Sequence, residues 1–100
     1  MSISFQDFEH STDRTWSDRA DFANALLGLA GEAGEVADLG KKELYHGKEV
    51  DTIDYIHEVG DVLFYLARIA REKGFSLEQA AIMNIAKLRA RYPDGFEQRP

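Results

Sequence analysis

The chain contains no cysteine, which excludes disulfide scaffolds, thiolate metal sites and thiol nucleophiles. Its only prolines are Pro93 and Pro100, so no proline interrupts a helix before the last eight residues. No apolar run reaches the roughly 18 residues that cross a membrane, and the first ten residues lack the basic and apolar parts of a signal peptide. We therefore expect a cytoplasmic protein that has no membrane partner.

An excess of positive charge is also missing, because 12 lysines and arginines stand against 18 aspartates and glutamates, for a net charge of −6. Binding to a nucleic-acid backbone needs concentrated positive charge, so nucleic acid is not an expected partner. The segment from 32 to 61 holds nine acidic and three basic residues and by itself carries a charge of −6. With 44% hydrophobic residues in 100 positions, the chain predicts a single domain over residues 1–100.

Apolar residues recur at intervals of three and four along most of the chain, and no segment of comparable length alternates with a period of two. This pattern predicts an all-α fold with four helices, near 3–12, 18–46, 51–73 and 76–91. Gly47 and Gly74 are expected to cap helix ends in left-handed conformation, and Ser76 with Gln79 predicts a capping box. The tail from Tyr92 is expected to be irregular.

The second predicted helix is long for a chain of this size. About 28 residues would extend about 42 Å, whereas a compact chain of 100 residues has a radius of gyration of about 13 Å. Either this helix breaks or subunits pack along it, and we expect a four-helix bundle-like fold packed against a partner subunit, as a homodimer or homotetramer. Four glycines inside it indicate close helix packing or room for a ligand; they are Gly28, Gly31, Gly34 and Gly40.

Two acidic pairs lie within the predicted helices. Glu32 and Glu35 are three residues apart, as are Glu58 and Asp61, so each pair shares one side of a helix. Leu29, Val36 and Leu39 fall within about 60° of Glu32, and Glu58 has a similar apolar surrounding, so we expect the four carboxylates to face the interior.

Acidic pairs on helices usually lie on the solvated surface, but these four carboxylates are predicted on the apolar side of each helix. Ionised carboxylates facing a core cost several kcal/mol each without compensation, and four of them repel one another. A bound divalent cation would offset both the cost of burial and the mutual repulsion. Ligation by oxygen alone favours Mg²⁺, with Mn²⁺ as a substitute. Such ions keep open positions for water and for substrate phosphates, which would bring a triphosphate to this acidic segment.

The pattern Glu32-x-x-Glu35, followed after 22 residues by Glu58-x-x-Asp61, resembles the MazG-like all-α nucleoside triphosphate pyrophosphohydrolases. The resemblance continues through Leu-Ala-Gly-Glu-Ala-Gly-Glu-Val-Ala-Asp, through Glu-Val-Gly-Asp-Val-Leu-Phe-Tyr-Leu-Ala and into Asn84-x-x-Lys87-Leu, and it covers residues 20–96. It implies Mg²⁺-dependent hydrolysis of a nucleoside triphosphate to the monophosphate and pyrophosphate, in nucleotide-pool housecleaning. It also implies that the four acids bind metal, unless one glutamate, for which Glu35 is the candidate, activates the attacking water.

Further residues are candidates for binding the substrate. Asn84, Lys87 and Arg91 share one edge of the last predicted helix, and the resemblance favours phosphate or sugar contacts for the first two over a solvated basic edge. Of the adjacent Lys41 and Lys42, at most one is expected to reach phosphates, with Lys41 as the candidate. Trp16 is the candidate for stacking on the base, although packing is the commoner role of such aromatic residues.

Two other functions fit parts of the sequence. A di-iron helical protein would need paired Glu-x-x-His motifs, and the chain has one, Glu43-x-x-His46. A non-catalytic helical dimerisation module would fold normally and show no metal-dependent turnover. Dinucleotide-binding and Walker phosphate loops are excluded, because neither glycine motif occurs.

Overall fold

The computed structural model of the chain describes residues 1–17 and 19–95. These residues form α1 (Phe5–Thr12), a short 3₁₀-helix η1 (Asp13–Thr15), α2 (Phe22–Tyr45), α3 (Thr52–Lys73) and α4 (Leu77–Arg91), with no strand among them. The predicted all-α fold is therefore confirmed. Residue 18 of the predicted helix 18–46 and residues 96–100 of the predicted tail lie outside the described residues.

The helix ends follow local capping chemistry. The Ser76 hydroxyl accepts from the Gln79 amide and the Gln79 side chain accepts from the Ser76 amide, both at 3.0 Å, which confirms the capping box. Gly47 and Gly74 adopt φ values of 63° and 76° after α2 and α3, as expected for left-handed caps. The prediction that the second helix begins near residue 18 is wrong, because Asp21 caps α2 by accepting from the Asn24 amide at 2.9 Å.

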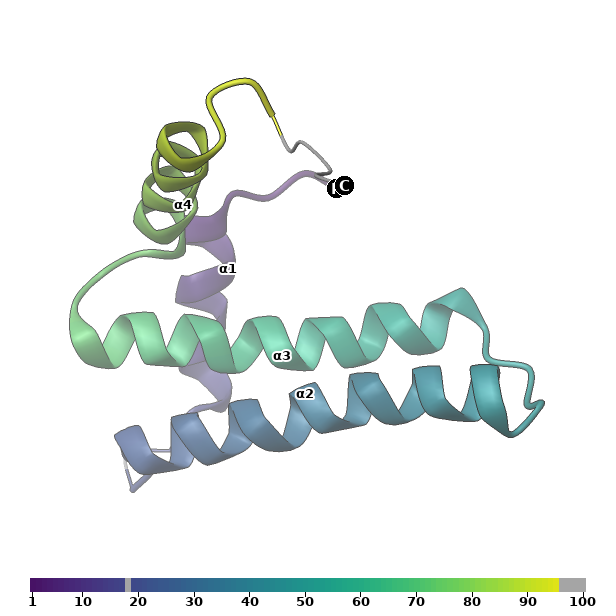
Figure 1. The fold of residues 1–100 in the computed structure, drawn as a ribbon. Coiled ribbons are helices and arrows are strands. Elements are labelled where there is room, and N and C mark those ends of the chain that lie inside the picture. Colours follow the sequence, from purple (N-terminus) through teal and green to yellow (C-terminus); the bar gives the residue numbers. More distant parts are fainter. Residues whose placement is uncertain (18, 96–100) are drawn as a thin grey trace.

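The prediction left open whether the long second helix breaks, and it does not. Helix α2 runs unbroken beside α3 as an antiparallel hairpin, while α1 and α4 lie across one end of α3 (Figure 1). Within the described chain α4 contacts α1 and α3 but not α2. The radius of gyration is 16.6 Å, above the ~13 Å of a compact domain of this length.

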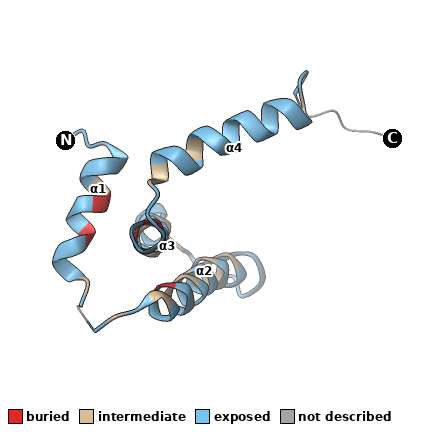
Figure 2. Ribbon diagram, turned by 90° about the vertical axis from the view of Figure 1, so that its left-hand side faces the viewer, coloured by how far each residue is buried: buried red, intermediate tan, exposed pale blue. Residues whose placement is uncertain are grey.

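Little of the chain is buried when it is alone. Among the described residues the fully buried apolar ones are three alanines, and nearly all of α4 is exposed (Figure 2). Large apolar side chains are exposed on every α-helix, among them Phe5, Leu27, Ile56 and Met83. None of the helices in the described part of the chain is long and apolar enough to span a membrane.

Candidate metal centre

The register of the α2–α3 hairpin determines which acidic residues meet. Tyr65 of α3 lies against the backbone of α2 at Gly28. Because the helices are antiparallel, one turn further along each of them brings Glu32 opposite Asp61. The next turn places Glu35 and Glu58 at the same level along the hairpin.

Three of the four predicted acids form one cluster, which we call the carboxylate cluster: Glu32, Glu58 and Asp61. One carboxylate oxygen from each lies within 4.8 Å of the others. Burial raises the pKa of Glu32, and the charges of Asp61, Glu58 and Glu35 raise it further. The cluster therefore holds its negative charges close enough to repel one another.

Glu35 is not a member of this cluster and is exposed. Its charge still acts on Glu32, one turn earlier on the same helix. The expectation that all four carboxylates face the interior is wrong in part, because Asp61 is exposed as well and only Glu32 and Glu58 are half-buried. On α2 beside the cluster, a Cβ atom built at Gly31 or Gly34 meets nothing within 4 Å, and α4 makes no contact with this helix.

The carboxylate cluster suits a divalent cation on two grounds. Its donors are all carboxylate oxygens, the atoms that Mg²⁺ and Mn²⁺ prefer. Among the described residues, no lysine or arginine forms an ion pair with any of its three members. Nothing in this part of the chain neutralises them, so an external cation is the natural partner.

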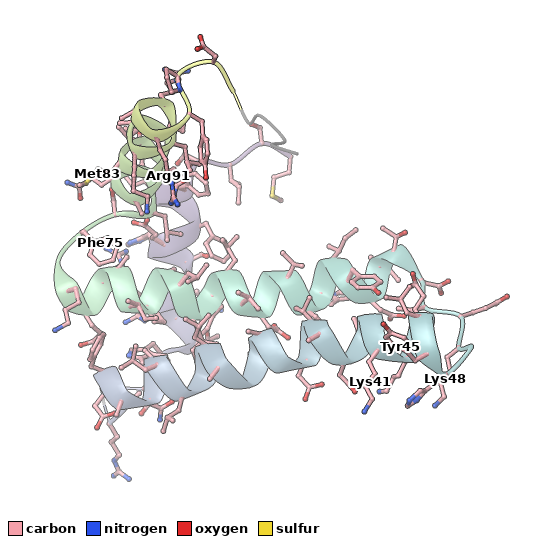
Figure 3. All side chains as sticks on the ribbon, viewed as in Figure 1. Lys41, Tyr45, Lys48, Phe75, Met83 and Arg91 are labelled. Carbon is pink, nitrogen blue, oxygen red and sulfur yellow. The ribbon has the colours of Figure 1, made fainter. Side chains whose placement is uncertain are left out.

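Lys41 and Lys42, which follow the first acidic pair on α2, differ in their contacts. Lys42 forms an ion pair with Asp38 at 3.0 Å, four residues earlier on α2. This contact lowers the pKa of Asp38 and raises that of Lys42. Lys41 is exposed and points away from α3 (Figure 3), so in the single chain it does not face the carboxylate cluster.

The three predicted binding residues of the last helix, Asn84, Lys87 and Arg91, are exposed on α4. The guanidinium of Arg91 lies 5.4 Å from the centre of the Tyr92 ring. Helix α4 makes no contact with α2 and lies at the C-terminal end of α3, whereas Glu58 and Asp61 are in the N-terminal half of α3, so the structure does not bring these residues to the carboxylate cluster of the same chain (Figure 1).

Trp16, the candidate for base stacking, follows η1 and is half-buried against α3. Its ring centre lies 6.1 Å from that of Phe64 and 6.3 Å from that of Tyr65, and the Arg68 guanidinium lies 4.9 Å above it. The structure thus gives Trp16 a packing role one helical turn from the carboxylate cluster, and stacking on a base stays a prediction.

A second charged group holds η1 to α3, and we call it the paired cluster: Asp13, Arg68 and Arg71. Arg68 Nη1 donates to Asp13 Oδ1 at 2.5 Å and to the Thr12 hydroxyl at 3.0 Å, while Arg71 reaches Asp13 Oδ2 at 3.1 Å. Sequence reasoning missed this cluster, because no local pattern connects residues 55 positions apart.

The di-iron alternative finds no support in the described residues. Glu43 accepts a hydrogen bond from the Tyr55 hydroxyl at 3.4 Å. In the part of the chain that the structure describes, neither Glu43 nor His46 belongs to a group of three potential metal ligands.

Fold and site together define an all-helical protein whose antiparallel helix pair carries a carboxylate centre suited to a divalent cation. Residues 21–96 match the sequence profile of the MazG nucleotide pyrophosphohydrolase domain. The chain therefore belongs to this family, as the resemblance implied.

Two relatives are similar to the chain. It is 33% identical over 91 residues to dCTP pyrophosphatase 1 of Mus musculus, an alignment that covers 85% of this chain and 54% of the relative. It is 37% identical over 76 residues to the Gene 37 protein of Mycobacterium phage L5, covering 72% of this chain and 67% of that protein. The chain thus spans about half the length of the mouse relative. No solved structure gives a significant match.

Proposed function

We propose that this chain is a Mg²⁺-dependent nucleoside triphosphate pyrophosphohydrolase acting as one domain. The observation that carries the proposal is the carboxylate cluster, with three carboxylate oxygens within 4.8 Å and no internal cation partner in the described chain. Membership of the MazG family supports the reaction class. Nucleotide-pool housecleaning is the role that we infer from the family.

The four acids divide into two tasks in the proposed reaction. Glu32, Glu58 and Asp61 would hold the metal, which would neutralise charge on the polyphosphate and lower the pKa of the attacking water. Glu35 lies outside the cluster yet close enough to act on Glu32, so it is the candidate to accept the proton of the attacking water. The water oxygen bonds to the α-phosphorus, the bond from that phosphorus to the bridging oxygen breaks, and pyrophosphate leaves.

We further propose that the active unit is a homodimer or homotetramer. The exposed apolar side chains of α2, α3 and α4 support this, because a monomer rarely leaves so many of them uncovered. Within one chain, the basic residues of α4 do not reach the carboxylate cluster, whereas α4 of a second copy could lie beside it. In that assembly Asn84, Lys87 and Arg91 of one copy approach the cluster of another, and Lys87 acts as a point charge for phosphate.

The substrate is tested with a panel of deoxynucleoside and ribonucleoside triphosphates in Mg²⁺, resolving monophosphate, diphosphate, pyrophosphate and orthophosphate. We expect monophosphate and pyrophosphate, and we place dCTP first in the panel because the mouse relative is named for it. Release of orthophosphate with a diphosphate would overturn the reaction. Absence of turnover with every nucleotide would leave the dimerisation module as the function.

Light scattering after size-exclusion chromatography tests the assembly. A species of two or four times the chain mass of 11.3 kDa supports the proposal. A monomer at every concentration used in the activity assay would contradict it.

A further inference from the structure

The Tyr65 ring of α3 packs on α2 at a position where a glycine is required. A Cβ atom at Gly28 would overlap the Tyr65 ring, whereas a Cβ at Gly31 or Gly34 would meet nothing within 4 Å. At Gly40 the nearest atom is the Tyr55 hydroxyl at 3.9 Å, an ordinary contact. Among the glycines of α2, Gly28 alone therefore lets an aromatic ring rest on the helix backbone.

The Tyr65 ring is braced on its other sides. Phe64 meets it edge-on, with ring centres 5.2 Å apart and planes at 89°, and Trp16 meets it edge-on at 6.3 Å. Trp16 is in turn covered by Arg68, which the Asp13 carboxylate holds. With neighbours on these sides, the ring has little freedom to swing away from Gly28.

This contact lies one helical turn from the carboxylate cluster on both helices. Gly28 precedes Glu32 by four residues, and Tyr65 follows Asp61 by four, so the same interhelical gap that the ring fills is the gap that the carboxylates span. One carboxylate oxygen from each of the three acids lies within 4.8 Å of the others, so the mutual repulsion of their charges acts to widen this gap. A rigid contact beside them would hold the two helices at a separation that lets carboxylates of both supply ligands to one cation.

We propose that Tyr65 is a positioning residue: its ring, seated on the Gly28 backbone, sets the separation of α2 and α3 at which Glu32 and Asp61 hold a common divalent cation. This inference rests on the metal site of the proposed function. It assigns Tyr65 no contact with substrate, and the ring rather than the hydroxyl performs the task.

The test measures Mn²⁺ affinity by electron paramagnetic resonance titration of the full chain without nucleotide. Gly28→Ala adds the overlapping methyl group and is expected to weaken Mn²⁺ binding about tenfold or more, the usual effect of disturbing groups that orient metal ligands. Gly31→Ala is the matched control, since it adds the same group to the same helix in open space, and wild-type affinity is expected. Circular dichroism and light scattering verify that each variant retains its helicity and assembly.

Three further variants separate the ring from its hydroxyl and from general damage. Tyr65→Phe keeps the ring and should bind Mn²⁺ as the wild type does, whereas Tyr65→Ala should bind it about tenfold more weakly. In the Tyr65→Ala background the Gly28→Ala change has no ring to strike, so it should cost less than about twofold. In turnover assays, Gly28→Ala should raise the Mg²⁺ concentration for half-maximal rate more than it lowers the rate at saturating Mg²⁺.

The outcomes distinguish this inference from the proposed function. If the wild type binds no Mn²⁺, the metal site itself fails, and the inference fails with it. If the wild type binds Mn²⁺ but Gly28→Ala binds equally well, only the positioning role is overturned. Equal losses from Gly28→Ala in both backgrounds, or a loss in Tyr65→Phe as large as in Tyr65→Ala, would overturn it as well.

Discussion

Helix α3 contributes to two charged clusters: the paired cluster, in which opposite charges meet, and the carboxylate cluster, in which only negative charges meet. In the paired cluster, Arg68 and Arg71 both contact Asp13, and the hydrogen bond from Arg68 is the main cause that lowers the pKa of this carboxyl. In the carboxylate cluster, three acids meet without a basic partner in the described chain, and the pKa of Glu32 is raised.

This difference separates a structural role from the binding role that we propose for the carboxylate cluster. The paired cluster satisfies its charges within the chain and connects η1 to α3, so it needs nothing from outside. In the carboxylate cluster, the repulsion among the three charges is not compensated within the described chain. Proteins retain such unfavourable groups at sites where a bound ligand compensates them. Both clusters contain acids on or near the same helix, so composition alone does not distinguish them.

Removing a carboxylate of the proposed active site has the largest expected effect. Asp61→Asn and Glu35→Gln should each lower turnover by at least about 100-fold, because one weakens the metal site and the other removes the candidate base. Helicity by circular dichroism should stay unchanged, since both side chains are exposed. Retained turnover in both variants would remove the assignment of the metal site.

The carboxylate cluster should lower the free energy of unfolding when no metal is bound and raise it when Mg²⁺ is bound. Wild-type protein in Mg²⁺ at 100 times its dissociation constant should gain about 2.7 kcal/mol in the free energy of unfolding. Glu32→Gln should lose this gain, and without metal it should melt at a higher temperature than the wild type at neutral pH. The reason is that a folded-state pKa raised above the ordinary 4.5 makes ionised Glu32 unfavourable once the pH exceeds that value.

Calorimetric melting curves with and without Mg²⁺ measure both effects. A metal-free Glu32→Gln protein that melts below the wild type would show that the carboxylates do not repel one another in the folded chain. An unchanged response to Mg²⁺ would show that Glu32 does not bind the ion.

The sequence predicted those features that depend on neighbouring residues. Helix periodicity and caps such as Ser76 with Gln79 are local, and the three-residue spacing of acids is sufficient to place each pair on one side of a helix. The start of α2 was misplaced because Asp21 stops the helix within an otherwise permissive stretch. The ring of Tyr65 on Gly28 and the pairing of Asp13 with Arg68 depend on tertiary contacts, which no local pattern encodes.

Breaking the paired cluster should reduce stability to an extent that depends on burial. Arg68→Met should lower the free energy of unfolding by about 1 to 3 kcal/mol, because its side chain is only 8% exposed and it holds both Thr12 and Asp13. Arg71→Met, whose side chain is 36% exposed, should cost less than about 1 kcal/mol. Urea denaturation measures both, and equal losses would contradict the distinction that burial draws between the two arginines.

The smallest expected effect is on the acid limb of the stability curve. The pKa of Asp13 lies below its ordinary 3.8 in the folded chain, so its contribution is present above that pH and is lost as the pH falls through the folded value. Many carboxyl groups titrate in this range, so the informative quantity is the stability difference between the wild type and Asp13→Asn. This difference should shrink as the pH falls below about 3.8, measured by urea denaturation at a series of pH values. A constant difference across the series would mean that the Asp13 carboxylate owes its role to shape and neutral hydrogen bonding, and the contrast between the paired cluster and the carboxylate cluster would then not be one of charge.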